Sequence, residues 1–301
     1  MSIIQKIKKN LKISALIQQL DMSLKYSQKK SILEQNILFN STPGVSNIKY
    51  CDHDIIVSLT TFGKRLHEVH LAIESIMEQT MKANRIILWL DYSYQNQILP
   101  KALEFQQKRG LEIRFCEDIR SYKKLIPTLK LYPNDAIITI DDDLIYEFDL
   151  LENLIEPYIK DQSYIYCHRN HKMLLDKNGK LLSYNNWIHN CNDTSPNHFN
   201  FPTTGGGTLF PPNSLDSEVF NQKVFMSICQ YADDIWFKAM ALKKGTLAKK
   251  VYSHDNKGED YMINSSVQDI SLTNINVYGE SLNDKQLEAV FSLYNLYPLL
   301  S

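Results

Sequence analysis

The sequence predicts an α/β protein built on a mainly parallel sheet. Two observations carry this prediction: short apolar runs rich in β-branched residues, and stretches of helical periodicity between them. Strands that alternate with helices of about 10–15 residues form βαβ units, and these units build parallel sheets. With 301 residues, 44% of them hydrophobic and 22% charged, the chain has an ordinary globular composition.

Four apolar runs in the first half are expected to be buried strands. They are residues 54–60, 85–90, 111–115 and 136–140. Apolar residues at three- and four-residue spacing predict helices between these runs. The expected helices are residues 66–79, 95–108 and 121–131, the last interrupted by Pro127.

The pattern is less regular after residue 150. Short strands are expected near residues 164–167, 172–175, 180–186, 208–210 and 250–253. A helix is expected to begin at Asp233, and the end of the chain shows helical periodicity. We therefore divide the chain into an N-terminal extension (residues 1–49), a main domain (50–280) and a C-terminal helix (281–301).

The N-terminal extension is more basic than the rest of the chain. It holds eight lysines against Asp21 and Glu34, a net charge of +6. Apolar residues recur in it at roughly helical spacing: Ile3, Ile4, Ile7, Leu11, Ile13, Ile17 and Leu20. This pattern predicts a basic amphipathic helix. Such a helix either packs on the main domain or lies on an anionic membrane surface, and the sequence leaves both interpretations open.

Net charge, cysteine spacing and apolar runs also indicate in which compartment the protein works and which partners it binds. The net charge of −1 offers no broad basic surface, so no nucleic-acid partner is expected. The five cysteines are scattered without CxxC spacing, which is typical of reduced thiols. We expect no secretory leader, because Lys6, Lys8 and Lys9 interrupt the apolar residues at the N-terminus, and the sequence has no run of about 18 apolar residues for a transmembrane helix. We expect a cytoplasmic protein, peripheral on the inner face of the plasma membrane if its extension binds lipid.

Three carboxylates, Asp141 to Asp143, directly follow the fourth expected strand. In open parallel sheets ligands bind at the carboxyl ends of the strands, where Thr60 and Asp91 are also expected. Carboxylates this close raise one another's pKa, and a hard divalent cation such as Mg²⁺ or Mn²⁺ relieves the repulsion and binds phosphate oxygens. A solvated loop or a helix cap is the alternative interpretation.

Three further features occur later in the chain. Asp233 and Asp234 open an apolar helix, where they fit either helix capping or a general base beside an acceptor pocket. Glycines 205–207 allow a backbone to approach a ligand closely, or they form an ordinary turn. His254 follows an expected strand and is either a metal ligand or a structural histidine.

Six segments, taken in order, resemble the glycosyltransferases of the GT-A fold, especially bacterial family 2-like enzymes of capsule and lipopolysaccharide assembly. The segments are IIVSLTTFGKRL (55–66), RIILWLD (85–91), KKLIPTL (123–129), AIITIDDDLIY (136–146), TTGGGTLFPP (203–212) and ADDIWFKAMAL (232–242). They cover roughly residues 54–256, and residues 1–49 fall outside. The resemblance implies the GT-A fold, a nucleotide-sugar donor and a bound Mn²⁺ or Mg²⁺.

The resemblance also implies roles for particular residues. The donor-binding residues would be Thr60, Phe62, Arg65, Asp91, Lys124, Asp141 and Asp142. The metal ligands would be Asp141, Asp143 and His254. The acceptor would contact Gly205, Gly206, Gly207, Asp233 and Trp236. Within the donor set, Asp91 would accept a hydrogen bond from the base, and Lys124 would reach the nucleotide or its phosphates.

Asp233 and Asp234 look like the Glu-Asp pair whose second residue is the catalytic base in these enzymes. Here Asp replaces the usual Glu, and Met240 lies near the position of an arginine often found along that helix. The assignment of the base therefore stays open between the two aspartates. With Asp234 as the base, the acceptor hydroxyl attacks the anomeric carbon in one displacement and inverts its configuration. A retaining course also stays open.

The expected function is transfer of a hexose from a nucleotide-diphosphate sugar, with UDP as the expected nucleotide. The acceptor would be a hydroxyl of a glycan or a lipid-linked glycan in surface polysaccharide biosynthesis. One alternative is a metal-dependent phosphotransferase or phosphatase of the haloacid-dehalogenase type, which normally carries its Asp-x-Asp on the first strand. The other is a noncatalytic carbohydrate-binding protein, which needs no paired carboxylates.

Overall fold

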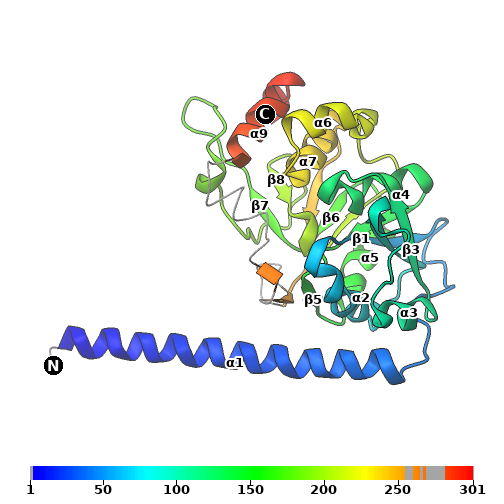
Figure 1. Ribbon diagram of the computed structural model, residues 1–301. Helices are drawn as coiled ribbons and strands as arrows, with labels where there is room; N and C mark the ends of the chain where they lie inside the picture. The colour runs from blue at the N-terminus through cyan, green and yellow to red at the C-terminus, as the bar shows by residue number, and fades with distance from the viewer. Residues whose placement is uncertain (1–2, 255–259, 265–266, 269–281, 301) are drawn as a thin grey trace. The chain divides into compact units, whose positions relative to one another are not determined.

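The computed structural model describes residues 3–254, 260–264, 267–268 and 282–300 (Figure 1). Residue contacts divide the chain into two compact units, Met1–Ser41 and Thr42–Ser301. The division falls at Ser41, whereas the extension was expected to end at residue 49. The expected boundary at residue 280 lies outside the described residues.

The first unit is a single long helix, α1 (Ile3–Phe39). Five apolar side chains in its middle are exposed by 44–62%: Ile13, Leu16, Ile17, Leu20 and Leu24. The last four lie three, four, seven and eleven residues after the first, so all five share one face of the helix. Among the described residues, no helix combines the length and apolar character needed to cross a membrane.

The second unit is built on a seven-stranded sheet with the order β10-β6-β9-β4-β1-β2-β3. Its strands are β1 (Ile55–Thr60), β2 (Arg85–Asp91), β3 (Leu111–Cys116), β4 (Ala136–Thr139), β6 (Ile165–Cys167), β9 (Thr208–Phe210) and β10 (Ala248–Lys250). All neighbours pair in parallel except β9, which is antiparallel to both β4 and β6. The expected α/β class with a mainly parallel sheet is confirmed.

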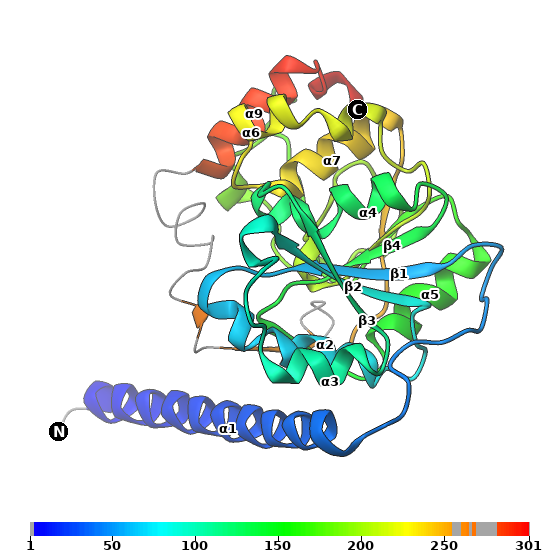
Figure 2. The same cartoon turned by 45° about the vertical axis from the view of Figure 1, so that its right-hand side comes forward.

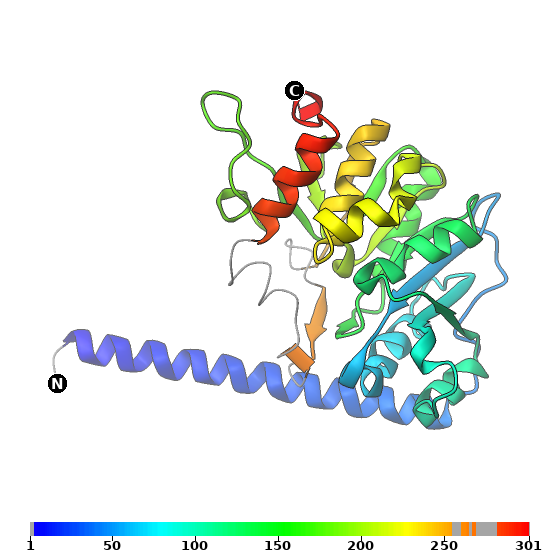
Figure 3. The same cartoon turned by 45° about the horizontal axis from the view of Figure 1, so that its top comes forward.

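Helices cover both faces of the sheet, because alternate strand residues point to opposite sides. Ile138 of β4 packs in the core with α2 (Val69–Met77), α3 (Lys101–Gln107) and α5 (Leu150–Lys160). Its neighbour Ile137 packs in the core on the other face. The helices there are α4 (Ile126–Leu131), α6 (Gln222–Ile228), α7 (Asp233–Lys244) and α9 (Leu282–Leu293) (Figure 2). Helix α9 packs beside α6 and α7 (Figure 3).

Several elements differ from the sequence-based expectation. The helix expected at 95–108 is shorter, because Pro100 precedes its first turn and residues 92–94 form a 3₁₀ turn. The strand expected at 250–253 is β10, which begins at Ala248. Residues 180–186 form no strand beyond a single bridge from Leu181 to Leu175.

Four short strands form two additional two-stranded sheets. Strands β5 (Leu144–Tyr146) and β11 (Tyr261–Ile263) pair with each other, as do β7 (Asn170–Lys172) and β8 (Asn200–Pro202). Strand β5 follows the carboxylates after β4, so it turns the chain away from the edge of the main sheet.

Candidate functional site

Polar residues of the second unit converge at the carboxyl edge of its parallel strands. β1 ends at Thr60, and β4 ends at Thr139, just before the three carboxylates. Because β9 is antiparallel to β4, with Thr208 opposite Thr139, the chain enters β9 from this same edge. A cavity of about 480 Å³ lies here, within the roughly 300–1,000 Å³ typical of small-molecule sites.

The cavity brings together most of the candidate residues. Those in its lining are Thr60, Phe62, Arg65, Lys124, Asp141, Asp142, Asp143, Gly205, Gly206, Asp233 and Asp234. They come from five separate parts of the chain: the end of β1, the helical turn before α4, the end of β4, the segment before β9 and the start of α7. Such convergence is what a binding site on a parallel sheet requires.

Arg65 neutralises two of the three strand-end carboxylates. Its NH1 and NH2 groups lie 2.8 Å from Asp142 Oδ1 and 2.9 Å from Asp143 Oδ2. Gln268 Nε2 also donates to Asp143 Oδ2, at 2.8 Å. Burial raises the pKa of Asp142 to about 6, and burial together with the Asp141 charge raises the pKa of Asp143. The ionised forms of Asp142 and Asp143 are therefore disfavoured by burial and by repulsion, and a second cation beside them would stabilise these forms.

Lys124 links the strand-end cluster to the start of α7. Its Nζ lies 2.9 Å from Asp141 Oδ1 and 3.0 Å from Asp233 Oδ2, and the residue is 5% exposed. Burial alone would lower the pKa of Lys124, but the two carboxylates raise it above its usual value. Burial likewise raises the pKa of Asp141, yet the Lys124 charge reverses this and lowers it. Lys124 is thus a fixed cation inside the cavity.

The glycines before β9 leave room for this cluster. A Cβ at Gly205 would lie 1.9 Å from Asp141 Oδ2, and a Cβ at Gly206 would lie 2.8 Å from Arg169 Cβ. The Tyr146 hydroxyl donates to Gly205 O at 2.6 Å and accepts from Asp141 N–H at 2.8 Å. Glycine at 205 is therefore required by the close approach of a carboxylate.

Asp234 faces the cavity from the first turn of α7. Its Oδ1 accepts hydrogen bonds from the Thr204 N–H, at 2.9 Å, and from the Thr204 hydroxyl. Neither bond caps α7, whose N-cap is Ala232. Burial, with the Asp233 charge next, raises the pKa of Asp234 to about 6. A carboxylate with a pKa near 6 is suited to accept a proton at neutral pH.

Three candidate residues of the donor and acceptor sets lie outside the cavity lining. Asp91 caps the 3₁₀ turn after β2 by accepting from Ser93 N–H at 2.9 Å. Trp236 is fully buried in the core, and its indole N–H donates to Val219 O at 3.1 Å. Gly207 adopts a φ of +94° beneath Leu150 and His168. Each makes a local structural contact outside the cavity lining, and their roles toward a ligand stay predictions.

His254 also departs from the expected arrangement. Its Nε2 lies 2.7 Å from Asp149 Oδ2, its side chain is 49% exposed, and it does not line the cavity. The hydrogen bond to Asp149 raises the pKa of His254. The structure thus places His254 against Asp149 and outside the cavity lining, and its role as a metal ligand stays a prediction.

Asp141 and Asp143 suit a hard divalent cation by their chemistry. Both offer carboxylate oxygens, the ligands that Mg²⁺ and Mn²⁺ prefer. The Asp141 side chain is 40% exposed, and the Asp141 charge raises the pKa of Asp143, a repulsion that a cation relieves.

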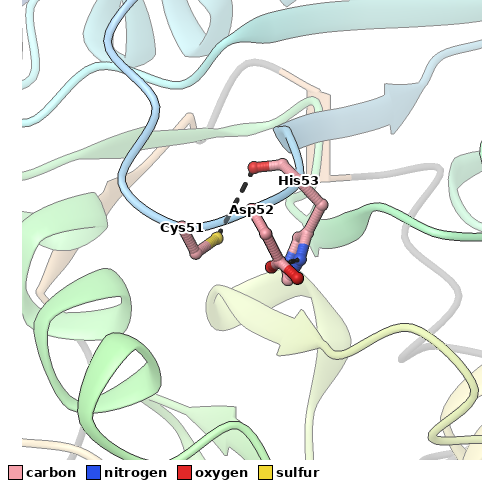
Figure 4. Close-up of side chains that lie close together, drawn as sticks. All are labelled: Cys51, Asp52 and His53. Carbon is pink, nitrogen blue, oxygen red and sulfur yellow. Dashed lines mark hydrogen bonds and ion pairs between the residues drawn. The ribbon is translucent and has the colours of Figure 1, made fainter.

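A different group is the one cluster of three His, Cys, Asp or Glu side chains, among those described, whose ligand atoms all lie within 4.8 Å. It consists of Cys51, Asp52 and His53 (Figure 4). It precedes β1, so it lies at the opposite end of that strand from the cavity. His53 already contacts Asp52 at 2.7 Å and Tyr158 OH at 2.6 Å, one through each ring nitrogen. Burial raises the pKa of Cys51, which disfavours the thiolate form that binds metals.

Several cavity residues carry no signal in the sequence. They are Arg120, Arg169, Tyr184, Phe201, Tyr231 and Asn283. They belong to loops, short strands and the last helix, where no apolar run or acidic motif marks them. Arg120 has a φ of +55°, supported by a hydrogen bond from its N–H to Asp118 Oδ1 at 3.0 Å. Backbone strain of this kind is often found at functional sites.

No family model matches the chain, and no curated protein matches it. Two solved structures that align with it are CMP:2-keto-3-deoxy-manno-octonic acid synthetase in complex with CTP, and HddC from Yersinia pseudotuberculosis. The first is 9% identical with a TM-score of 0.38, covering 66% of this chain and 89% of the synthetase. The second is 14% identical with a TM-score of 0.33, covering 54% and 78%. These alignments are loose and carry no conclusion about function.

Proposed function

We propose that the protein is a metal-dependent glycosyltransferase of the GT-A type, which transfers a hexose from a UDP-linked donor to a hydroxyl of a glycan or lipid-linked glycan. One observation carries the proposal: strand-end carboxylates, a buried lysine and a second carboxylate pair on α7 line the same cavity. The ordered segments that resemble GT-A enzymes of surface polysaccharide assembly agree with it.

The donor side of the cavity suits a nucleotide diphosphate. Phe62 is 44% exposed at its wall, and the Arg65 guanidinium lies 5.7 Å from the centre of the Phe62 ring. An aromatic ring next to a cation can bind a base and a phosphate. Lys124 supplies a second, fixed positive charge, and cations aimed at the leaving diphosphate stabilise charge as the glycosidic bond breaks.

Asp141 and Asp143 would hold Mn²⁺ or Mg²⁺, which withdraws charge from the leaving diphosphate when bound. The residues of the chain perform the remaining work. Lys124 keeps Asp141 ionised, as the lowered pKa of that carboxyl indicates. Arg65 keeps Asp142 and Asp143 in place through its two ion pairs.

The acceptor side contains the base. Asp234 would remove the proton from the acceptor hydroxyl, while the Thr204 hydrogen bonds hold its carboxylate in one orientation. Attack from the face opposite the leaving group inverts the configuration of the anomeric carbon. Asp233, which is paired with Lys124 at 3.0 Å, would bind the acceptor.

A direct test is a screen of nucleotide sugars with the purified full chain. We expect UDP to bind in calorimetry and a UDP-hexose to be hydrolysed slowly in Mn²⁺ or Mg²⁺, because water enters the acceptor site when no glycan is present. Excess EDTA should stop this hydrolysis. Absence of UDP binding, with and without Mn²⁺, would contradict the proposal.

We also propose that α1 recruits the protein to anionic membranes. The motive is the +6 charge of residues 1–49 together with the exposed apolar face at Ile13 to Leu24. Deleting residues 1–41, the first unit, should lower binding to vesicles containing anionic lipid. Transfer to a soluble acceptor should change little, since the cavity lies wholly in the second unit.

Vesicle co-sedimentation with and without anionic lipid would measure this effect. A matched variant with Leu20→Gln and Leu24→Gln keeps the charge and removes part of the apolar face. Equal sedimentation of the full chain and the deletion variant would instead favour α1 as a packing element.

A further inference from the structure

Two side chains in the first two turns of α9 accept hydrogen bonds from the backbone of two residues that line the cavity. Asp284 Oδ1 accepts a hydrogen bond from Tyr184 N–H at 2.7 Å, across 100 residues of sequence. Gln286 Oε1 accepts from Tyr231 N–H at 2.9 Å. Gln286 is 7% exposed, and its Nε2 donates to Leu282 O at 3.2 Å, which fixes the orientation of its amide. Both contacts run from the C-terminal helix to the cavity wall.

These tyrosines belong to an aromatic part of the wall. The Tyr184 ring lies 6.2 Å from Phe201 and 5.0 Å from Trp187, measured between ring centres. The Arg120 guanidinium lies 4.6 Å from the centre of the Tyr231 ring. Tyr184, Phe201 and Tyr231 all line the cavity. The backbone hydrogen bonds to α9 position Tyr184 and Tyr231. Aromatic packing and a cation–π contact then restrain the rings of these two residues.

The aromatic wall lies near the candidate base. Tyr184 and Asp234 line the same cavity, and burial, with the Asp234 charge next, raises the pKa of Tyr184 to about 12. Asn283 of α9 lines the same cavity and offers an amide. Rings that pack against C–H groups, next to carboxylate and amide groups that bind hydroxyls, suit a pyranose ring.

We propose that α9 is a positioning element of the acceptor site, holding Tyr184 and Tyr231 through Asp284 and Gln286 so that an acceptor pyranose packs on this wall. This inference rests on the proposed function and names the acceptor class: a neutral hexopyranoside with a free hydroxyl directed toward Asp234. Asp284 and Gln286 act through the two tyrosines and do not themselves contact the sugar.

The test uses ligand-observed saturation-transfer NMR on the full chain with UDP and the diamagnetic ion Mg²⁺ present. The probes are the methyl β-glycosides of galactose, glucose and N-acetylglucosamine. We expect at least one of them to receive saturation from the wild type. The double variant Asp284→Ala/Gln286→Met should bind that sugar about tenfold more weakly, since two hydrogen bonds are lost. UDP affinity, measured by calorimetry, should stay unchanged.

Three further variants sharpen the result. Asp284→Asn keeps an acceptor oxygen and should restore most of the sugar binding lost in Asp284→Ala. Glu288→Gln, an exposed position on the same helix, should match the wild type. Tyr184→Leu and Tyr231→Leu keep the backbone N–H groups that α9 holds and remove the rings, so each should weaken sugar binding by about three- to tenfold.

The outcomes separate this inference from the proposed function. If the wild type binds no UDP, the proposed function fails and the inference fails with it. If UDP binds but none of the sugars does, or if the double variant binds sugar as the wild type does, the inference is overturned. If the double variant proves unfolded in a thermal melt, unchanged sugar binding in both tyrosine variants overturns it.

Discussion

Substitution of Asp234 by Asn should lower the rate of hexose transfer by about 10²–10⁴-fold, the usual contribution of general-base catalysis. The amide keeps the size of the carboxylate and an oxygen for the Thr204 N–H, but it cannot take the acceptor proton. UDP binding should survive, because Asp141, Asp143 and Lys124 are unchanged. The measurement is steady-state transfer kinetics together with UDP calorimetry on the same preparation.

The same carboxylate predicts the pH dependence of transfer. The pKa of Asp234 is raised to about 6, and the base must be ionised to act. Transfer should therefore fall as the pH drops through about 6 and reach a plateau above it. Thr204→Val removes a hydrogen bond that lowers this pKa, so the acid limb should move to higher pH.

Asp233→Asn is the matched variant for this prediction. It leaves Asp234 in place but removes the charge that pairs with Lys124 at 3.0 Å. The acceptor KM should rise more than kcat falls. If Asp233→Asn loses turnover and Asp234→Asn retains it, then Asp233 is the base and Asp234 binds the acceptor. Full activity in both variants would mean that neither residue is the base.

Substitution of Asp143 by Ala should abolish detectable transfer and weaken UDP binding in Mn²⁺. The bound ion is expected to supply several kcal/mol of charge stabilisation, and about 4 kcal/mol corresponds to roughly a thousandfold in rate. In excess EDTA the wild type and the variant should bind UDP alike, since the ion is then absent from both. The comparison of the two UDP affinities, with and without Mn²⁺, isolates the role of the carboxylate in metal binding.

Asp52→Ala is the control for this variant. Asp52 belongs to the Cys51, Asp52 and His53 cluster at the other end of β1, and its side chain is 89% exposed. Transfer and its response to Mn²⁺ should be unchanged in this variant. If Asp52→Ala loses the Mn²⁺ response and Asp143→Ala keeps it, the ion acts at the wrong end of the strand for the proposed mechanism. Undiminished wild-type transfer in EDTA would equally contradict a metal role.

The central strands could be predicted because buried strands consist almost entirely of apolar residues, which are easy to recognise in a sequence. β1 and β4 are buried along nearly their whole length, so they consist of apolar, β-branched residues that no exposed segment would carry. Helices α5 and α6 could not be predicted with the same ease. Pro157 lies inside α5, and α6 buries a single residue, Phe225. A three-residue strand such as β9 carries no sign of its direction, so its antiparallel pairing was not foreseeable.

The three carboxylates of the site could be predicted from the sequence, since Asp141 to Asp143 directly follow a recognisable strand. The ion pairs that neutralise these carboxylates could not. Arg65 lies 77 residues from Asp142 in sequence, and no local pattern indicates that pair. His254 and Asp91 show the opposite limitation: each follows a strand, yet a nearby polar group satisfies it. The position of a residue at a strand end does not determine which way its side chain turns.

Strand β9 lies antiparallel beside β4, and the pairing of these two strands fixes the distance between the strand-end carboxylates and the Thr204–Asp234 pair. Thr139 lies opposite Thr208, so backbone hydrogen bonds fix the offset between the segment after β4, which carries Asp141, and the segment before β9, which carries Thr204 with its partner Asp234. A slip of one residue would move one half past the other by about 3.3 Å and reverse the faces of its side chains. Insertions and deletions between residues 203 and 210 should therefore not be tolerated. Variants with altered acceptor preference are best sought by substitutions in the acceptor wall that keep the length of this segment.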